Sequence, residues 1–139
     1  MAGCDKTAGV NAQDAHGGTE WLVDATGCTP AVLRDLAALQ ELLGDVVREL
    51  GLSVAAEPVW KVFPGEGGIT GMVLLAESHL TVHTFPERGV AAFNLYCCAP
   101  RPAWDWHGRL GAALGAGRVG VRSFPRVGLG PSAPRPRED

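Results

Sequence analysis

Four consecutive strand candidates occupy the middle of the chain, and they restrict the folds that it can adopt. These candidates run over residues 54–62, 69–76, 80–85 and 90–98. Turns that contain glycine or proline separate them. Helices are expected on both sides, over 29–50 and 103–114, with further strands at 20–25 and 118–124. This β-α-β-β-β-β-α-β order predicts an α+β fold, in which an antiparallel sheet carries two helices on one face.

The first helix has the clearest boundaries. Thr29 is expected as its N-cap, Pro30 suits the first helical position, and Gly51 is expected to end it. Apolar residues follow at three- and four-residue steps: Val32, Leu36, Leu39, Leu43, Val46 and Leu50. This repeat predicts one continuous helix whose apolar stripe packs on the sheet.

The composition fits one folded domain. The chain has 139 residues, of which 46% are hydrophobic and 19% are charged, and this excludes a chain that is disordered throughout. We expect a flexible N-terminal arm at 1–18, a domain at 19–125 and a flexible Pro-rich tail at 126–139.

Charge and hydropathy argue against nucleic acid and membranes as partners. The formal net charge is −3, and no basic patch stands out. The longest apolar run, Met72–Ala76, is far shorter than the ~18 residues of a membrane span. A signal peptide is not expected, and four cysteines without C-x-x-C spacing are expected as reduced thiols. These features predict a cytoplasmic protein.

Residues 77–98 contain side chains that are suited to chemistry. On a strand, His79, Thr81, His83 and Phe85 share one face, and the residues between them share the other. From this pattern alone, a half-solvated strand without a functional role is the simplest interpretation.

Two kinds of catalytic site fit this segment poorly. Four residues of strand put the Cα atoms of His79 and His83 about 13 Å apart, too far for both imidazoles to bind one zinc ion. No metal is therefore expected. Ser78 lacks a G-x-S-x-G context, and neither Cys97 nor Cys98 lies in a protease signature, so a hydrolase is also disfavoured.

The string E-S-H-L-T-V-H-T-F-P-E at 77–87 closely resembles the self-processing site of the short, prokaryotic-type S-adenosylmethionine decarboxylases. The resemblance continues through Gly68–Gly71, through Ala91-Ala92 and to Cys98, and the order of elements agrees over about 20–125. It implies a two-layer α/β sandwich. It also implies a homodimer of cleaved αβ protomers, in which each active site takes residues from both protomers.

Members of this family are made as inactive proenzymes. The resemblance implies that the Ser78 hydroxyl attacks the Glu77 carbonyl, and that cleavage after Glu77 leaves a β chain, 1–77, and an α chain, 78–139. Ser78 would become a pyruvoyl group, which would serve in place of a metal or pyridoxal phosphate. Its ketone would form a Schiff base with the substrate amine and accept the electron pair that CO2 leaves behind.

The resemblance also implies roles in processing and catalysis. His83 would transfer protons during processing, and Thr70 would supply a supporting hydroxyl where the family usually has Ser. Cys98 would be the general acid that reprotonates the substrate α-carbon. A small buried side chain is the alternative for Cys98.

Three further residues match positions that bind S-adenosylmethionine. Phe63 and Phe85 would sandwich the adenine, and Glu87 would accept hydrogen bonds from the ribose hydroxyls. Core packing remains an alternative for Phe63, and an exposed turn charge remains an alternative for Glu87.

Two departures from the family pattern concern the substrate. Asn94 replaces a common Asp, and Glu20 stands near an expected His, where an added carboxylate could attract a basic substrate tail. The leading hypothesis is decarboxylation of S-adenosylmethionine to S-adenosylmethioninamine for spermidine synthesis. The alternatives are a pyruvoyl decarboxylase of arginine or ornithine, and an unprocessed, non-catalytic regulatory homologue.

Overall fold

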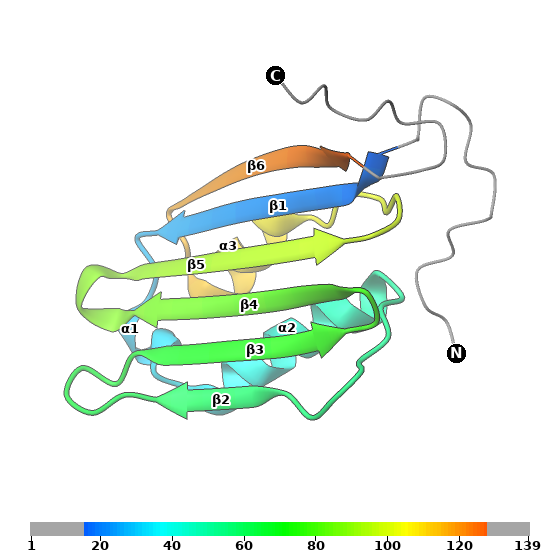
Figure 1. Ribbon diagram of the computed structural model, residues 1–139. Coiled ribbons are helices and arrows are strands. Elements are labelled where there is room, and N and C mark those ends of the chain that lie inside the picture. Colours follow the sequence, from blue (N-terminus) through cyan, green and yellow to red (C-terminus); the bar gives the residue numbers. More distant parts are fainter. Residues whose placement is uncertain (1–15, 128–139) are drawn as a thin grey trace, which may run out of the picture.

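The computed structural model describes residues 16–127, which form a six-stranded sheet with its helices on one face (Figure 1). The strands are β1 (His16–Thr26), β2 (Val59–Val62), β3 (Ile69–Leu75), β4 (Ser78–Phe85), β5 (Val90–Cys97) and β6 (Arg118–Val127). Their order is β2-β3-β4-β5-β1-β6, and every neighbouring pair is antiparallel. The predicted α+β class and two-layer arrangement are confirmed.

The helices are α1 (Pro30–Leu33), α2 (Leu36–Glu49), α3 (Trp106–Leu114) and a short 3-10 helix, η2 (Pro86–Arg88). The long helices α2 and α3 lie side by side behind the sheet in Figure 1. No described helix has the length and apolar character needed to cross a membrane.

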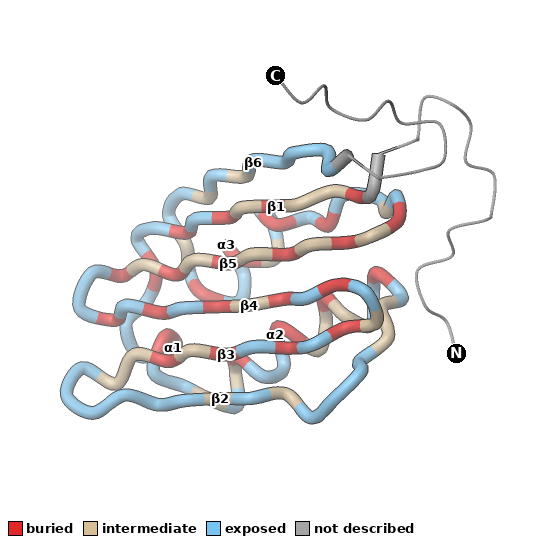
Figure 2. Tube along the Cα trace, viewed as in Figure 1, coloured by how far each residue is buried: buried red, intermediate tan, exposed pale blue. Residues whose placement is uncertain are grey.

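The core lies between the sheet and the helices. Alternate residues of the central strands are buried, as the red segments of Figure 2 show. On β5 the buried set is Ala91, Phe93, Leu95 and Cys97, and on α2 it is Leu39, Leu42, Leu43 and Val46. The opposite residues of each strand face away from the helices, so the second face of the sheet has no covering layer within residues 16–127.

The prediction of one continuous first helix is wrong, because the chain breaks between α1 and α2. Asp35 has an extended backbone, and its side chain accepts a hydrogen bond from the Ala38 amide at 3.2 Å. Asp35 is therefore the N-cap of a second helix. The apolar repeat continues across the break, which is why periodicity alone did not reveal it.

The strand expected over 54–62 is much shorter than predicted. Val54 forms an isolated bridge with Leu75, and a continuous strand begins at Val59. Pro58 directly precedes that strand and has no amide hydrogen to donate. The second helix also starts later than expected, at Trp106, because Asp105 caps it by accepting from the Gly108 amide.

The sheet extends into both ranges that were expected to be flexible. β1 begins at His16 and β6 ends at Val127. The rest of those ranges, 1–15 and 128–139, lies outside the described residues, so the division into one domain and two flexible ends stays a prediction.

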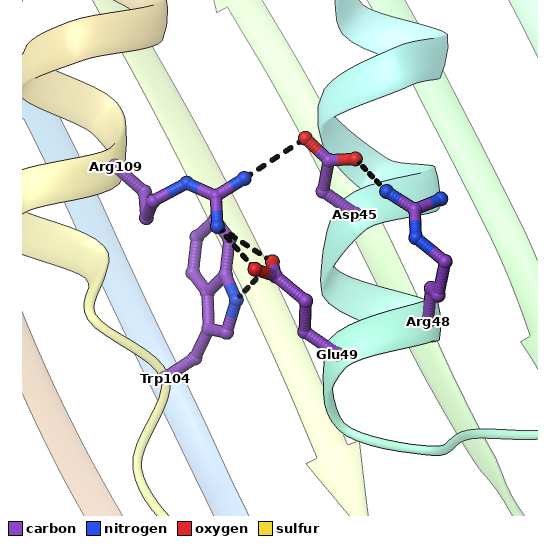
Figure 3. Close-up of polar contacts among 5 residues, drawn as sticks. All are labelled: Asp45, Arg48, Glu49, Trp104 and Arg109. Atoms are coloured by element: carbon purple, nitrogen blue, oxygen red, sulfur yellow. Dashed lines mark hydrogen bonds and ion pairs between the residues drawn. The ribbon is translucent and has the colours of Figure 1, made fainter.

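A polar network joins α2 to α3 on the helical side of the molecule (Figure 3). The Trp104 indole donates to Glu49 at 3.0 Å, and Arg109 donates to both oxygens of Glu49 and, at 2.9 Å, to Asp45. These contacts lower the pKa of Glu49. The hydrogen bond from Trp104 has the largest effect, and the hydrogen bond from Arg109 has the next largest. The folded state therefore favours the ionised form of the Glu49 carboxylate.

We predict that Glu49→Gln destabilises the protein at neutral pH and matters less in acid. A carboxyl whose pKa is lowered on folding stabilises the fold above its ordinary value of 4.5, and that contribution is lost as the pH falls through the folded pKa. Urea unfolding at pH 7 and at pH values below about 4 measures the difference. Glu41→Gln, on the exposed side of α2, is the matched control, and an effect of Glu49→Gln that is independent of pH would contradict the prediction.

Candidate active site

The predicted site residues gather around strands β3 and β4, which form a tight hairpin. Leu75 pairs with Ser78, so Ala76 and Glu77 alone make the turn. Glu77 has a φ of 58°, the left-handed region that non-glycine residues rarely adopt. A side chain in this conformation costs about 1–2 kcal/mol. The carbonyl that Ser78 is expected to attack thus belongs to a strained residue.

Ser78 lies at the base of this turn and is buried, with 7% of its surface exposed. Its hydroxyl donates to the Ala76 carbonyl at 3.5 Å. A pocket of about 430 Å³ opens beside it, lined by Leu74, Leu75, Glu77, Ser78, His79, Tyr96 and Arg126. The Ser78 end of the hairpin is therefore both held in place and next to open space.

Cys98 lies next to the same turn, and its Sγ is 3.7 Å from Oε2 of Glu77. Cys97 is buried, and burial raises the pKa of its thiol to about 11. Cys28 and Cys97 are free thiols, whereas Cys98 is disulfide-bonded, so the expectation of reduced cysteines is wrong for Cys98. Cys4 lies outside the described residues. A disulfide sulfur carries no proton, so an acid role for Cys98 needs the reduced thiol.

The opposite end of the hairpin holds the residues expected to act in processing and substrate binding. Thr70 on β3 faces His83 on β4, with Oγ1 and Nδ1 2.9 Å apart. A second pocket, of about 410 Å³, is lined by Phe63, Pro64, Glu66, Gly68, Thr70, His83, Thr84, Phe85 and Glu87. Five of the predicted site residues thus line one pocket. Phe63 and Thr70 reach it from a part of the chain that precedes β4.

Hydrogen bonds between the Thr84 side chain and backbone groups hold the walls of this second pocket in place. Thr84 accepts from the Ile69 amide at 2.9 Å and donates to the Leu33 carbonyl at 2.8 Å, which ties β4 to both β3 and α1. A Cβ at Gly68 would lie 2.8 Å from the Thr84 carbonyl oxygen, so this close approach requires glycine. Phe63 and Phe85 are both exposed, which argues against core packing for Phe63.

The two ends of the hairpin are too far apart to act on each other within one chain. Ser78 and His83 are five residues apart on β4, which corresponds to about 16 Å at the usual rise per residue. Their side chains also point to opposite faces, since Ser78 is buried and His83 is exposed. One chain therefore holds two separate halves of the predicted site.

Arg126 was missed by the sequence analysis, which placed it in the flexible tail. The predicted strand ended at Phe124, but β6 continues through Pro125 to Val127 because it is an edge strand, where proline is tolerated. Arg126 lines the Ser78 pocket and donates to Glu20 at 2.7 Å. Glu20 is therefore paired, and its charge is not available by itself to attract a basic substrate tail.

Asn94, the other departure, lies on the open face of β5, opposite Thr81 and Leu22. Within residues 16–127, no three His, Cys, Asp or Glu side chains are grouped so that they could hold a metal ion.

The fold defines a class of small α+β proteins with a six-stranded antiparallel sheet, and comparisons identify the family. The model of the S-adenosylmethionine decarboxylase family matches residues 19–127, and this chain belongs to that family. The S-adenosylmethionine decarboxylase proenzyme of Symbiobacterium thermophilum is 38% identical over 98 residues, which cover 68% of this chain and 70% of that protein.

The proenzyme of Pyrococcus abyssi is 36% identical over 84 residues, which cover 60% of this chain. That match spans 59% of the length of the Pyrococcus protein. The crystal structure of the adenosylmethionine decarboxylase from Aquifex aeolicus superposes with a TM-score of 0.72 at 25% identity, covering 86% of this chain and 98% of that chain.

Proposed function

We propose that this chain is the proenzyme of a pyruvoyl-dependent decarboxylase that converts S-adenosylmethionine to S-adenosylmethioninamine and CO2 for spermidine synthesis in the cytoplasm. One observation carries the proposal: Thr70, His83, Phe63, Phe85 and Glu87 line a single pocket. Phe63 and Thr70 lie outside the 77–87 motif, yet they line the same pocket as three residues of that motif, which supports one shared role. The names of the relatives agree with this function.

The first step is cleavage of the chain by its own serine. The Ser78 Oγ attacks the Glu77 carbonyl, so that an ester replaces the amide and the positive φ of Glu77 can relax. Loss of the Ser78 α-proton then releases Glu77 as a carboxylate, and hydrolysis of the remaining unsaturated residue releases ammonia. A pyruvoyl group at position 78 would supply a carbonyl for the substrate amine and an acceptor for the electrons that CO2 leaves behind.

The surrounding residues divide the remaining work. The His83 imidazole, held by Thr70, moves protons during processing. Phe63 and Phe85 provide aromatic faces for the adenine and for the sulfonium cation, and the Glu87 carboxylate accepts hydrogen bonds from the ribose. Cys98, as a reduced thiol, returns a proton to the substrate carbon.

A second copy of the chain would complete the site. Ser78 and His83 lie at opposite ends of β4, and the open face of the sheet exposes large apolar side chains: Met72, Leu74 and Phe124. Two sheets that pack face to face around a two-fold axis would cover these side chains. They would also bring Ser78 of one protomer to His83 of the other.

The pairing of Glu20 with Arg126 supports S-adenosylmethionine over arginine or ornithine as the substrate. The paired carboxylate no longer provides the unbalanced negative charge that a basic side chain would seek. An unprocessed regulatory protein would have no use for the strained turn, the buried Ser78 and the Thr70–His83 contact together.

We predict that the purified protein consists of two fragments, split between Glu77 and Ser78, and that the second fragment has a blocked N-terminus. Intact-mass analysis under denaturing conditions measures this directly. Ser78→Ala leaves the chain whole and abolishes CO2 release, because no other residue can supply the carbonyl. CO2 release from carboxyl-labelled S-adenosylmethionine, arginine and ornithine identifies the substrate.

A full-length species in an active preparation would contradict self-processing. Cleavage combined with release of CO2 from arginine or ornithine, and none from S-adenosylmethionine, would retain processing and overturn the proposed substrate.

A composite site predicts that one inactive chain restores the processing of another. Ser78→Ala and His83→Ala chains, made separately, should remain uncleaved. When they are co-expressed with different tags, the His83→Ala chain should be cleaved, because its Ser78 meets the intact His83 of its partner. The Ser78→Ala chain stays whole and serves as the internal control. Absence of cleavage in a purified mixed dimer would rule out the shared site.

Cys98→Ala should be processed normally but turn over slowly. Loss of a general acid or base typically lowers kcat by roughly 10²- to 10⁴-fold. The assay is run with excess reductant, so that the wild-type Cys98 is a thiol. Cys97→Ala, at the buried neighbouring position, is the control, and full turnover by Cys98→Ala would remove Cys98 from the acid role.

A further inference from the structure

Arg126 lines the same pocket as the serine that is expected to become the reactive carbonyl, and the proposed reaction gives it no role. We propose that Arg126 binds the α-carboxylate of the amino-acid substrate. This inference rests on the proposed function of Ser78. It would make Arg126 a binding residue that distinguishes the substrate from its decarboxylated product.

The guanidinium of Arg126 is held from two sides. Glu20, on the neighbouring strand β1, accepts from its Nη1 at 2.7 Å. The Tyr96 ring lies 5.8 Å from its central carbon, and His79 stacks on Tyr96 at 5.8 Å between ring centroids. The register explains this row, because Glu20 pairs directly with Tyr96 and Tyr96 pairs directly with His79. Arg126 is thus oriented over the sheet towards the hairpin turn.

Pairing with Glu20 does not prevent Arg126 from binding a ligand. A guanidinium has five donor hydrogens in a planar fork, and one contact to Glu20 leaves others for a second carboxylate. Of the described residues that line the Ser78 pocket, Arg126 is the one with a permanent positive charge. The pocket wall otherwise consists of apolar groups, Ser78, Glu77, His79 and Tyr96.

The chemistry of the reaction puts a carboxylate near this cation. The substrate amine must reach the carbonyl formed at position 78, and the α-carboxylate is attached to the same carbon as that amine. An amino acid that reacts in this pocket therefore brings its carboxylate close to Arg126. The product has lost that carboxylate, so Arg126 should strengthen binding of the substrate and not of the product.

The chain contains a matched control for this arginine. Arg122 lies on the same strand and forms an ion pair with Asp24 of β1 at 3.6 Å, which repeats the Arg126–Glu20 pair four residues further along each strand. Arg122 does not line the Ser78 pocket. Changing it tests the effect of losing an ion pair between β1 and β6 without changing the pocket.

The experiment compares wild-type protein with Arg126→Gln, Arg126→Lys and Arg122→Gln, each shown by intact mass to be cleaved after Glu77. Steady-state kinetics give KM and kcat for the substrate, and calorimetric titration gives the Kd of the decarboxylated product. The ligand pair is S-adenosylmethionine and S-adenosylmethioninamine. If the labelled-CO2 assay identifies arginine or ornithine instead, that amino acid and its amine are used.

Arg126→Gln should raise KM about 10- to 100-fold, the usual effect of losing a hydrogen bond to a charged group. The Kd of the product should stay within about twofold of the wild-type value. Arg126→Lys should fall between wild type and Arg126→Gln, because it keeps the charge and loses the fork. Arg122→Gln should change neither constant.

Two results would overturn the inference. An unchanged KM for Arg126→Gln would show that the carboxylate binds elsewhere. Equal weakening of substrate and product would show that Arg126 supports the shape of the pocket and does not contact the carboxylate. Wild-type protein that is uncleaved and inactive would instead overturn the proposed function, and this inference with it.

Discussion

The antiparallel register of β3 and β4 is the constraint on which the rest of the site depends. It pairs Leu75 with Ser78 and Thr70 with His83. The first pairing leaves two residues for the turn and forces a positive φ on Glu77. The second brings a hydroxyl and an imidazole to within 2.9 Å. A shift of one residue would turn every side chain of β4 to the other face and remove both features.

The same register also separates the reactive serine from the processing histidine. A strand is straight on this scale, so five residues along β4 cannot fold back on themselves. The exposed apolar side chains of the open face give a physical reason for a second sheet to pack there. In this view, dimer formation both buries those side chains and builds the active site. The unpaired chain would be an unprocessed intermediate.

The sequence predicted the fold class because its strong signals were local ones. Alternation and turn residues indicated six strands in the right order and the two faces of β4, although the length of β2 was wrong. The break at Asp35 was missed because the apolar repeat continues across it, so that the repeat alone does not reveal where a side-chain cap starts a new helix. The length of β2 was overestimated because the β-propensity of residues 54–62 does not indicate how many of them pair with a neighbouring strand.

The site was predicted in part, and for a different reason. Ser78, His83 and Cys98 were predicted from a family resemblance, which assigns roles and not distances. The separation of Ser78 and His83 follows instead from the strand that this segment forms. The Thr70–His83 contact joins residues on two strands and follows from register, which the sequence does not specify. Arg126 was missed because the predicted strand ended at Phe124, whereas β6 continues to Val127.

The most direct test of the central claim is to reduce the active protein with a hydride donor in the presence of its substrate and to weigh both fragments. The account predicts that the fragment 78–139 gains mass from the ligand at its first residue, while the fragment 1–77 is unchanged. Activity from a chain that gains no ligand mass at position 78, or that keeps an ordinary serine there, would contradict the account.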